Sequence, residues 1–356
     1  MLARTPWIII LLLAACLPAG AGGIIVGYTS AIATTNYSQA LMDQIGQFKW
    51  YFAHASVGDN MMDGITDLNT ADSGRYQFQR VSEDATPPAG TSVGRIYDYA
   101  RGNPGWSAKV TTFTNYVRSG WRYPKVNFAA NKFCWIDQDA NVDTYINSMS
   151  ALEAAYPETL FVYMTMPLDT SSDYNNYLRN VFNTRLRGWV TTNDRVLFDV
   201  ADIESHDTNG ALCAFTYDGT NCQQLFTGYT DDGGHLNELG RPLVAQGFYA
   251  VAAAVLNADR DSDGMSDGHE LIAGTCPTSG VSVFGFDPAS TVAGGRMLVY
   301  WRSASNRCYS LGRTTNLLGS LQFSNLLTNV TATPPLNTYT DAPGAGPRIY
   351  RLGVWQ

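Results

Sequence analysis

Residues 49–60 have the sequence KWYFAHASVGDN, an apolar run followed by a tight turn. The apolar run predicts a β-strand that ends at Ala53, and residues 61–68 have the pattern of a helix. Ser56 lies at the tip of the turn between them. There the hydroxyl is exposed at the carboxyl edge of a sheet, and the backbone N–H near the helix N-terminus can stabilise a developing oxyanion. Ser56 is therefore a candidate nucleophile, and the alternative is that its hydroxyl caps the helix.

Strand and helix patterns alternate along this part of the chain. The sequence predicts further strands at 76–81, 126–136, 160–166 and 195–200, and helices at 36–48, 106–117, 142–155 and 172–190. This alternation predicts a parallel sheet with helices on both faces. In that architecture reactive groups collect outside the carboxyl ends of the strands. Ser56, the loop at Gly105 and the loop that holds Asp232 and His235 can all lie at such ends.

A second candidate for chemistry is the stretch YTDDGGHLN at residues 229–237, just before a helix predicted from 242 to 256. The Asp232 carboxylate can accept a hydrogen bond from one ring nitrogen of His235, which leaves the other nitrogen free to act as a base. This pair is two thirds of a catalytic triad and lacks only its nucleophile. The alternative is a capping Asp and a surface His in a loop.

Three blocks of sequence resemble the SGNH, or GDSL-like, hydrolase superfamily over residues 49–256. The blocks are FAHASVG at 52–58, GNPGWS at 102–107 and DGGHLN at 232–237. The resemblance implies a three-layer flavodoxin-like α/β domain that hydrolyses esters through a Ser nucleophile. By position it makes Ser56 the nucleophile, His235 the base and Asp232 its orienting partner. It also implies that the backbone N–H groups of Ser56 and Gly105 bind the oxyanion.

The chain departs from this family in two places. The Gly-Asp-Ser of the family is replaced by His54-Ala55-Ser56, and residues 131–137, NKFCWID, have no Gly where the family offers an Asn side chain to the oxyanion. Asn131 or Lys132 can donate instead, or that donor is missing, and one lost donor costs about a hundredfold or more in rate. His54 has no carboxylate nearby in sequence, so we expect a structural or substrate-contacting role for it.

The composition of the 356-residue chain indicates two domains and an exported protein. Its net charge of -8 argues against a nucleic-acid partner or an anionic membrane surface. Residues 1–21 resemble a signal peptide, because Arg4 precedes an apolar run that is too short to cross a bilayer. Cleavage after Ala21 would release a secreted bacterial protein. Lipidation of Cys16, in a lipobox-like LAAC, would instead give a cell-surface lipoprotein.

The other cysteines fit an oxidising compartment. Cys213 and Cys222 bracket a short loop and are expected to form a disulfide, and Cys276 and Cys308 can form a second one. Cys134 lies in an apolar run and is expected to be a buried thiol.

A calcium loop is the strongest motif in the chain. Residues 259–270, DRDSDGMSDGHE, place oxygen ligands at the positions of a twelve-residue calcium loop, with Gly264 at position 6. The expected ligands are Asp259, Asp261, Asp263, the carbonyl of Met265, Asp267 and Glu270. The alternative is a solvated acidic linker. The run resembles the thrombospondin type 3 repeats, which implies a structural calcium clamp at residues 258–277 between two domains.

Short alternating runs separated by Gly, Pro, Asn and Thr fill residues 281–356 and predict a small all-β sandwich domain. It can attach the protein to a surface or polysaccharide, or only add stability. Residues 22–257 would form the hydrolase-like α/β domain.

Together these features predict a secreted serine esterase that acts on an acyl ester, for example that of a carbohydrate, with structural Ca²⁺ and no catalytic cofactor. The alternative is a catalytically inactive domain of this kind that serves as a calcium-stabilised extracellular binding or structural protein.

Overall fold

The computed structural model describes residues 22–83, 94–120, 126–316, 322–342 and 347–355. Residues 1–21, which include the expected signal peptide and Cys16, lie outside them. The described chain forms an α/β unit that ends at Ala258 and a second unit that begins at Asp259. Among the helices of the described residues, none has both the length and the apolar character that a membrane crossing requires.

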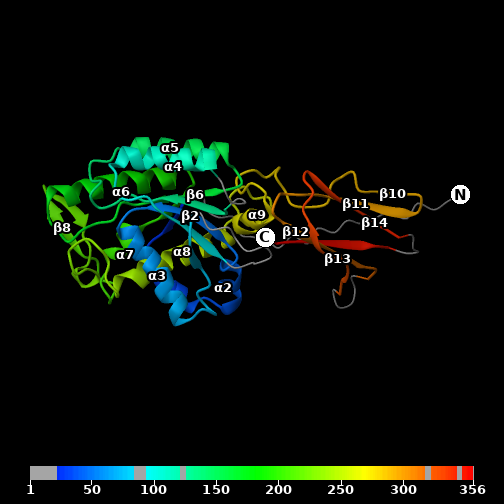
Figure 1. Ribbon diagram of the computed structural model, residues 1–356, viewed down its shortest axis with the longest axis horizontal. Coiled ribbons are helices and arrows are strands. Elements are labelled where there is room, and N and C mark those ends of the chain that lie inside the picture. The colour runs from blue at the N-terminus through cyan, green and yellow to red at the C-terminus, as the bar shows by residue number, and fades with distance from the viewer. Residues whose placement is uncertain (1–21, 84–93, 121–125, 317–321, 343–346, 356) are drawn as a thin grey trace. The chain divides into compact units, whose positions relative to one another are not determined.

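A seven-stranded sheet forms the centre of the α/β unit, in the order β1-β7-β6-β5-β2-β4-β3 (Figure 1). Every neighbouring pair is parallel, so the predicted parallel α/β fold is confirmed. The strands are β1 (Ile24–Val26), β2 (Lys49–His54), β3 (Gln79–Ser82), β4 (Arg95–Ala100), β5 (Phe128–Asn131), β6 (Leu160–Met164) and β7 (Val196–Phe198). The central position of β2 explains its continuous apolar run, since both of its faces are covered.

Helices cover both faces of this sheet and make the three layers (Figure 1). One face carries α1 (Tyr28–Ala33), α2 (Gln39–Ile45), α3 (Val57–Ala71), α7 (Val200–Glu204) and α8 (Gly240–Asn257), and the other carries α4 (Trp106–Gly120), α5 (Val142–Ala155) and α6 (Tyr174–Thr192). Alternate residues of β2 point to opposite layers. Phe52 packs edge-on against Phe248 of α8, whereas Tyr51 stacks on Phe113 of α4.

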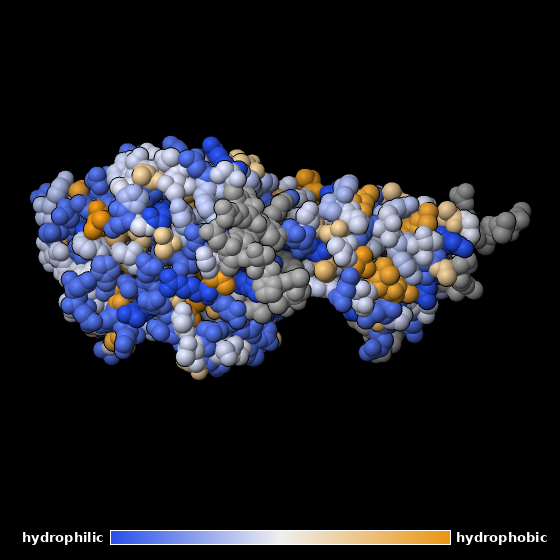
Figure 2. Space-filling model, viewed as in Figure 1, coloured by the Kyte–Doolittle hydropathy of each residue, from blue (hydrophilic) through white to orange (hydrophobic). Residues whose placement is uncertain are grey.

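The C-terminal unit contains two three-stranded antiparallel sheets, which confirms the predicted small all-β domain. Its elements are α9 (Asp267–Ala273), β10 (Thr291–Ala293), β11 (Arg296–Arg302) and β14 (Leu336–Asp341) with β12 (Cys308–Thr314), β13 (Ser324–Thr331) and β15 (Ile349–Trp355). Trp301 from one sheet and Tyr309 from the other are fully buried in a shared core. Apolar side chains are more frequent on the visible surface of this unit than on the polar surface of the α/β unit (Figure 2), and Val281 is 82% exposed.

The two expected disulfides are wrong, because the five cysteines of the described residues are free thiols. Cys213 and Cys222 flank the hairpin of β8 (Ala214–Tyr217) and β9 (Thr220–Gln223). Its register pairs Phe215 with Cys222, so Cys213 is a diagonal neighbour of Cys222. Diagonal side chains lie about 7–8 Å apart, too far for a disulfide without a backbone shift. The pairing of Cys276 with Cys308 had no support beyond their order in the sequence.

Candidate active site

Ser56 adopts a strained backbone conformation between β2 and α3. Its φ is 32° and its ψ is -83°, and its side chain makes no capping hydrogen bond to α3. The capping alternative is therefore not what the structure shows. A residue other than Gly at positive φ costs of order 1–3 kcal/mol, and such residues cluster at active sites. Ser56 thus has the kind of backbone strain that is common at active sites.

Cys134 is the nearest polar partner of the Ser56 hydroxyl, with 3.0 Å between Oγ and Sγ. β5 is shorter than predicted and ends at Asn131, although the Lys132 N–H still donates to the carbonyl of Ala53 in β2. The chain then leaves the sheet and carries Cys134 to the carboxyl end of β2. Cys134 is fully buried and free, as predicted for its thiol.

Asp232 and His235 form the pair that their spacing predicts. His235 Nδ1 lies 2.6 Å from one carboxylate oxygen of Asp232. The other oxygen accepts from the backbone N–H groups of His235 at 2.8 Å and Gly234 at 3.0 Å. These backbone donors, followed by the His235 ring, hold the pKa of Asp232 well below its usual range. The carboxylate is therefore ionised at neutral pH and can accept a hydrogen bond from Nδ1, so the ring contacts Asp232 through Nδ1 and not through Nε2.

Two contacts bring the loop of His235 to the Ser56 turn. Leu236 N–H donates to Asn60 Oδ1 at 3.1 Å, and the Asn60 N–H donates to the Ser56 carbonyl at 3.3 Å. The His235 ring also lies edge-on to the ring of Trp135, the residue that follows Cys134, with 6.3 Å between the two ring centroids. A Cβ on Gly234 would lie 2.9 Å from the Trp135 ring, so this approach requires Gly.

The structure thus places Ser56, Asp232 and His235 at one edge of the sheet. Among the described residues no hydrogen bond joins Ser56 Oγ to the His235 ring, and the Ser56 hydroxyl contacts Cys134 instead.

Gly105, the second predicted oxyanion donor, lies immediately before α4 and is exposed. It lines an open cleft of about 800 Å³ together with Trp106, Ile136 and Asp139. Ser56 is not part of this cleft's lining. Asn103 also lines the cleft, and its Nδ2 lies 3.6 Å from Cys134 Sγ, the atom that contacts Ser56.

The two side chains expected to replace the family's Asn donor are buried and make other contacts. Asn131 Oδ1 accepts from Arg101 at 2.5 Å, and Lys132 Nζ donates to the carbonyl of Phe133 at 3.0 Å. Both residues are almost fully buried. Burial lowers the pKa of Lys132 to about 8 and raises that of the nearby buried Glu204 to about 8, so both groups are shifted toward their neutral forms.

The structure also contains a ring of polar contacts around Cys134 that the sequence did not predict. Lys109 Nζ contacts Asp137 Oδ2 and also donates to Asn103 Oδ1 at 2.5 Å. Asp137 Oδ2 accepts from the Cys134 N–H at 2.7 Å, and Asn103 Nδ2 lies 3.6 Å from Cys134 Sγ. The sequence signal that could have revealed it is a charged Lys109 among the apolar residues of a predicted helix.

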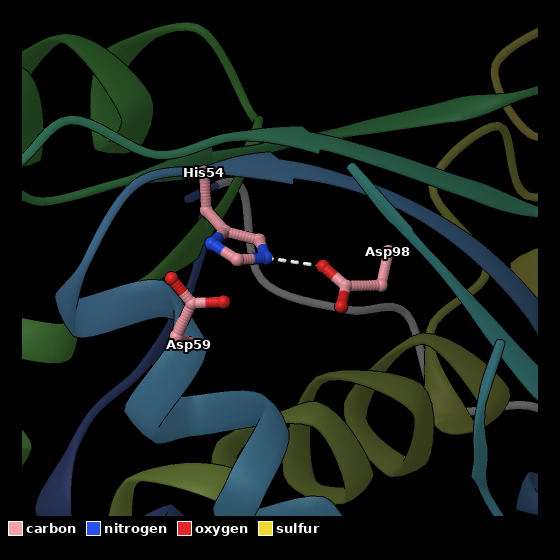
Figure 3. A group of neighbouring side chains, drawn as sticks. All are labelled: His54, Asp59 and Asp98. Carbon is pink, nitrogen blue, oxygen red and sulfur yellow. Dashed lines mark hydrogen bonds and ion pairs between the residues drawn. The ribbon is translucent and has the colours of Figure 1, made fainter. Parts of the chain in front are cut away.

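His54 is a buried structural residue of β2. Figure 3 shows its ring with Asp98 of β4 on one side and Asp59 of α3 on the other. His54 Nε2 contacts Asp98 Oδ1, and Arg80 Nε donates to the other oxygen of Asp98 at 2.5 Å. Ligand atoms of His54, Asp59 and Asp98 lie within 4.8 Å of one another, the spacing of a metal site. The Arg80 guanidinium, which also contacts Asp59 at 3.2 Å, already supplies the positive charge there.

Replacing Asp98 with Asn is expected to destabilise the fold by about 2 kcal/mol at pH 7, because the neutral amide cannot accept at both positions where His54 and Arg80 contact the carboxylate. Burial raises the pKa of Asp98, but His54 and Arg80 outweigh it and hold that pKa below its ordinary value. A depressed carboxyl pKa stabilises the fold above the unfolded pKa of about 3.9 and loses this effect as pH falls through the folded pKa. The difference in urea midpoint between wild type and Asp98→Asn should therefore shrink below about pH 4.

The matched control is Asp67→Asn, because Asp67 is an exposed carboxylate on α3. It should leave the midpoint almost unchanged at every pH. A difference for Asp98→Asn that stays constant down to low pH would contradict the ion-paired role of Asp98.

The loop at residues 259–270 holds carboxylates that fit a cation. Ligand atoms of Asp259, Asp261 and Asp263 lie within 4.8 Å of one another. One buried oxygen of each, and one of Glu270, has no hydrogen-bond partner. Burial, then Asp261 and Asp263, raise the pKa of Glu270 to about 9, which is the repulsion that a divalent cation would remove.

The other two predicted calcium ligands are Asp267 and the carbonyl of Met265. Asp267 is fully buried, accepts from the Arg260 N–H at 3.0 Å and pairs with the Arg260 side chain. Its carboxylate is therefore engaged inside the protein. Met265 lies beside Gly264, whose φ of 97° allows the sharp turn of such a loop.

No protein-family model matches the chain. Curated proteins give no match either. Among solved structures, a two-domain esterase active on acetylated mannans is 9% identical, with a TM-score of 0.36 over 94% of this chain and 92% of that chain. A carbohydrate esterase of family 3 from Talaromyces cellulolyticus is 17% identical, with a TM-score of 0.29 over 56% of this chain and 93% of that chain. A protein from Desulfitobacterium hafniense assigned to a lipolytic G-D-S-L family is 7% identical, with a TM-score of 0.38 over 57% of this chain and 99% of that chain.

Proposed function

We propose that this chain is a serine esterase that hydrolyses an acyl ester, with a carbohydrate ester as its substrate. The observation that carries the proposal is the strained Ser56 turn, tied through Asn60 to the loop of an oriented His235. Strain at a hydroxyl-bearing turn and an imidazole held by an ionised carboxylate are the two parts that nucleophilic acyl transfer needs. Support for a sugar is the neighbouring cleft, where Trp106 offers a stacking surface and Asp139 a polar contact.

The proposed reaction has two acyl-transfer steps. Ser56 Oγ bonds to the acyl carbon while its proton passes to His235 Nε2, and the carbonyl electron pair moves onto the oxygen. Collapse of this intermediate expels the alcohol, which takes the proton from His235. Water then attacks the acyl-enzyme, with His235 again as base, and releases the acid and free Ser56. Asp232 keeps the imidazole in the productive tautomer, and the N–H groups of Ser56 and Gly105 donate to the oxyanion.

A fluorophosphonate label tests the nucleophile directly. The folded wild-type protein is expected to be labelled at Ser56, because the reagent reacts with an activated Ser and not with an ordinary one. Peptide mass mapping would locate the label, and heat-denatured protein is the control. The contact of Ser56 with Cys134, in place of His235, favours the alternative of an inactive binding or structural protein. Folded wild-type protein that stays unlabelled would reject the proposed nucleophile and favour that alternative.

We further propose that residues 1–21 export the protein and that its loop at 259–270 binds structural Ca²⁺. The charge pattern around Arg4 supports export, which leaves either a free mature chain or one lipidated at Cys16. Support for calcium is the set of carboxylate oxygens without partners in the loop. Calcium would neutralise these carboxylates and stabilise the C-terminal unit, with no part in the acyl transfer.

A further inference from the structure

The buried pair of Lys109 and Asp137 is a feature that the proposed reaction leaves unexplained. The exposed fraction of Lys109 is 0% and that of Asp137 is 3%. Taking both charges out of water costs several kcal/mol per ion, and two apolar side chains would fill the same space at no such cost. In some proteins such a pair specifies a geometry, so the groups that this pair contacts are the place to look for its role.

One of these groups is the side-chain amide of Asn103. Lys109 Nζ has only donors, so the Asn103 atom 2.5 Å from it must be the carbonyl oxygen Oδ1. This fixes the orientation of the amide and directs Nδ2 to the opposite side, where it lies 3.6 Å from Cys134 Sγ. A thioether or thiol sulfur is a weak acceptor, so the NH₂ group keeps most of its donor capacity. Asn103 itself is exposed, and a substrate can reach it.

The same sulfur also contacts the nucleophile. Cys134 Sγ lies 3.0 Å from Ser56 Oγ, so the Asn103 amide and the Ser56 hydroxyl are neighbours of one atom. The Cys134 N–H in turn donates to Asp137 at 2.7 Å, which closes the ring through Lys109. The amide is thus held near the nucleophile by a network in which Cys134 is the member that contacts Ser56.

We propose that Asn103 Nδ2 donates a hydrogen bond to the oxyanion formed when Ser56 attacks the ester. This inference rests on the proposed esterase function. Asn103, which is exposed, then supplies the side-chain donor in place of Asn131 and Lys132, which are almost fully buried. Lys109 is a positioning residue, because it acts by orienting the Asn103 amide, and Asp137 positions Lys109 in the same way. A fixed donor aimed at developing charge is worth more than a mobile one, since nothing has to reorganise during the reaction.

Two substitutions of Asn103 test the donor. Asn103→Ala removes the amide, and Asn103→Asp keeps its shape and the contact with Lys109 but replaces the donor by an acceptor. Each is expected to lower kcat for a short acyl ester by about a hundredfold or more, with little change in KM. Melting temperature should not fall in Asn103→Asp. The matched control for added charge is Asn115→Asp, at an exposed position on α4, which should keep full activity.

A double-mutant cycle tests the role of Lys109. If Lys109 acts through Asn103, then Lys109→Met lowers kcat in the wild-type background but causes little further loss in the Asn103→Ala background. A purely structural role for Lys109 would instead give the same fractional loss in both backgrounds, and that result would overturn its assignment as a positioning residue.

The outcomes separate this inference from the proposed function. Loss of activity in Ser56→Ala, together with kcat within about threefold of wild type in Asn103→Ala, would reject Asn103 and leave the esterase standing. A loss in Asn103→Asp but not in Asn103→Ala would also reject the donor, because it would reflect only the added charge. Folded wild-type protein with neither ester turnover nor fluorophosphonate labelling would reject both proposals. The rate of fluorophosphonate labelling gives a second readout. The phosphonyl oxygen of the reagent occupies the oxyanion position, so loss of the Asn103 amide should slow labelling.

Discussion

Ser56→Ala is expected to lower kcat for a short acyl ester by about 10⁴-fold or more, since it removes the atom that forms the acyl-enzyme. The fold should survive, because the Ser56 side chain makes no capping bond to α3, and within the part of the chain that the structure describes its hydroxyl hydrogen-bonds only to the Cys134 thiol. His235→Asn should cost a similar factor. The double variant should lose little more than either single one, because nucleophile and base act as a unit. Initial rates on a panel of acyl esters give the measurement.

The variant Ser56→Gly tests whether the backbone strain at this turn is linked to activity. Glycine adopts a φ of 32° without the penalty that Ser56 incurs, so this variant should be as inactive as Ser56→Ala but more stable than wild type by about 1 kcal/mol. Higher stability combined with lost activity would show that the strain at this turn is maintained for function. Ester turnover by Ser56→Ala at a rate close to wild type would contradict Ser56 as the nucleophile.

The parts of this molecule that could be predicted are those encoded by local pattern. The apolar run of β2, the turn at Ser56 and the start of α3 are consecutive in sequence, so their periodicity indicates them directly. The pair of Asp232 and His235 is likewise a short-range feature. β4 has no such pattern, because Arg95 and Asp98 interrupt its apolar residues. The charge on Asp98 is buried only because His54 and Arg80 arrive from elsewhere in the chain.

The members of the ring of Asn103, Lys109, Cys134 and Asp137 could not be predicted beyond the signal of a charged Lys109, since its contacts join the entry to α4 with the loop after β5. Separation along the chain gives no sign that Lys109 meets Asp137. The wrong prediction of a Cys213–Cys222 disulfide could have been avoided, because the sequence between the two cysteines indicates a hairpin turn. Asp218-Gly219 is typical of a two-residue hairpin turn, and that turn sets the register that makes the two cysteines diagonal neighbours.

Removal of calcium is expected to lower the melting temperature of the C-terminal unit while ester turnover at ordinary temperature is unchanged. A ligand that binds only the folded state at about a thousand times its Kd contributes about 4 kcal/mol. The carboxylates of Asp259, Asp261 and Asp263 converge with oxygens that have no protein partner, so the folded loop without a cation is held together against its own repulsion. Calorimetry with calcium or with a chelator measures the shift, and the α/β unit that holds Ser56 should unfold as before.

Two substitutions in the loop distinguish a calcium ligand from a structural partner. Asp261→Asn should erase the difference between calcium and chelator, because Asp261 has a free oxygen facing the other carboxylates. Asp267→Asn breaks the buried contact with Arg260, so it should lower the melting temperature in both conditions and preserve the difference between them. The exposed control Asp67→Asn should do neither. Equal melting temperatures of the wild type with calcium and with chelator would show that residues 259–270 are a solvated acidic linker and not a metal site.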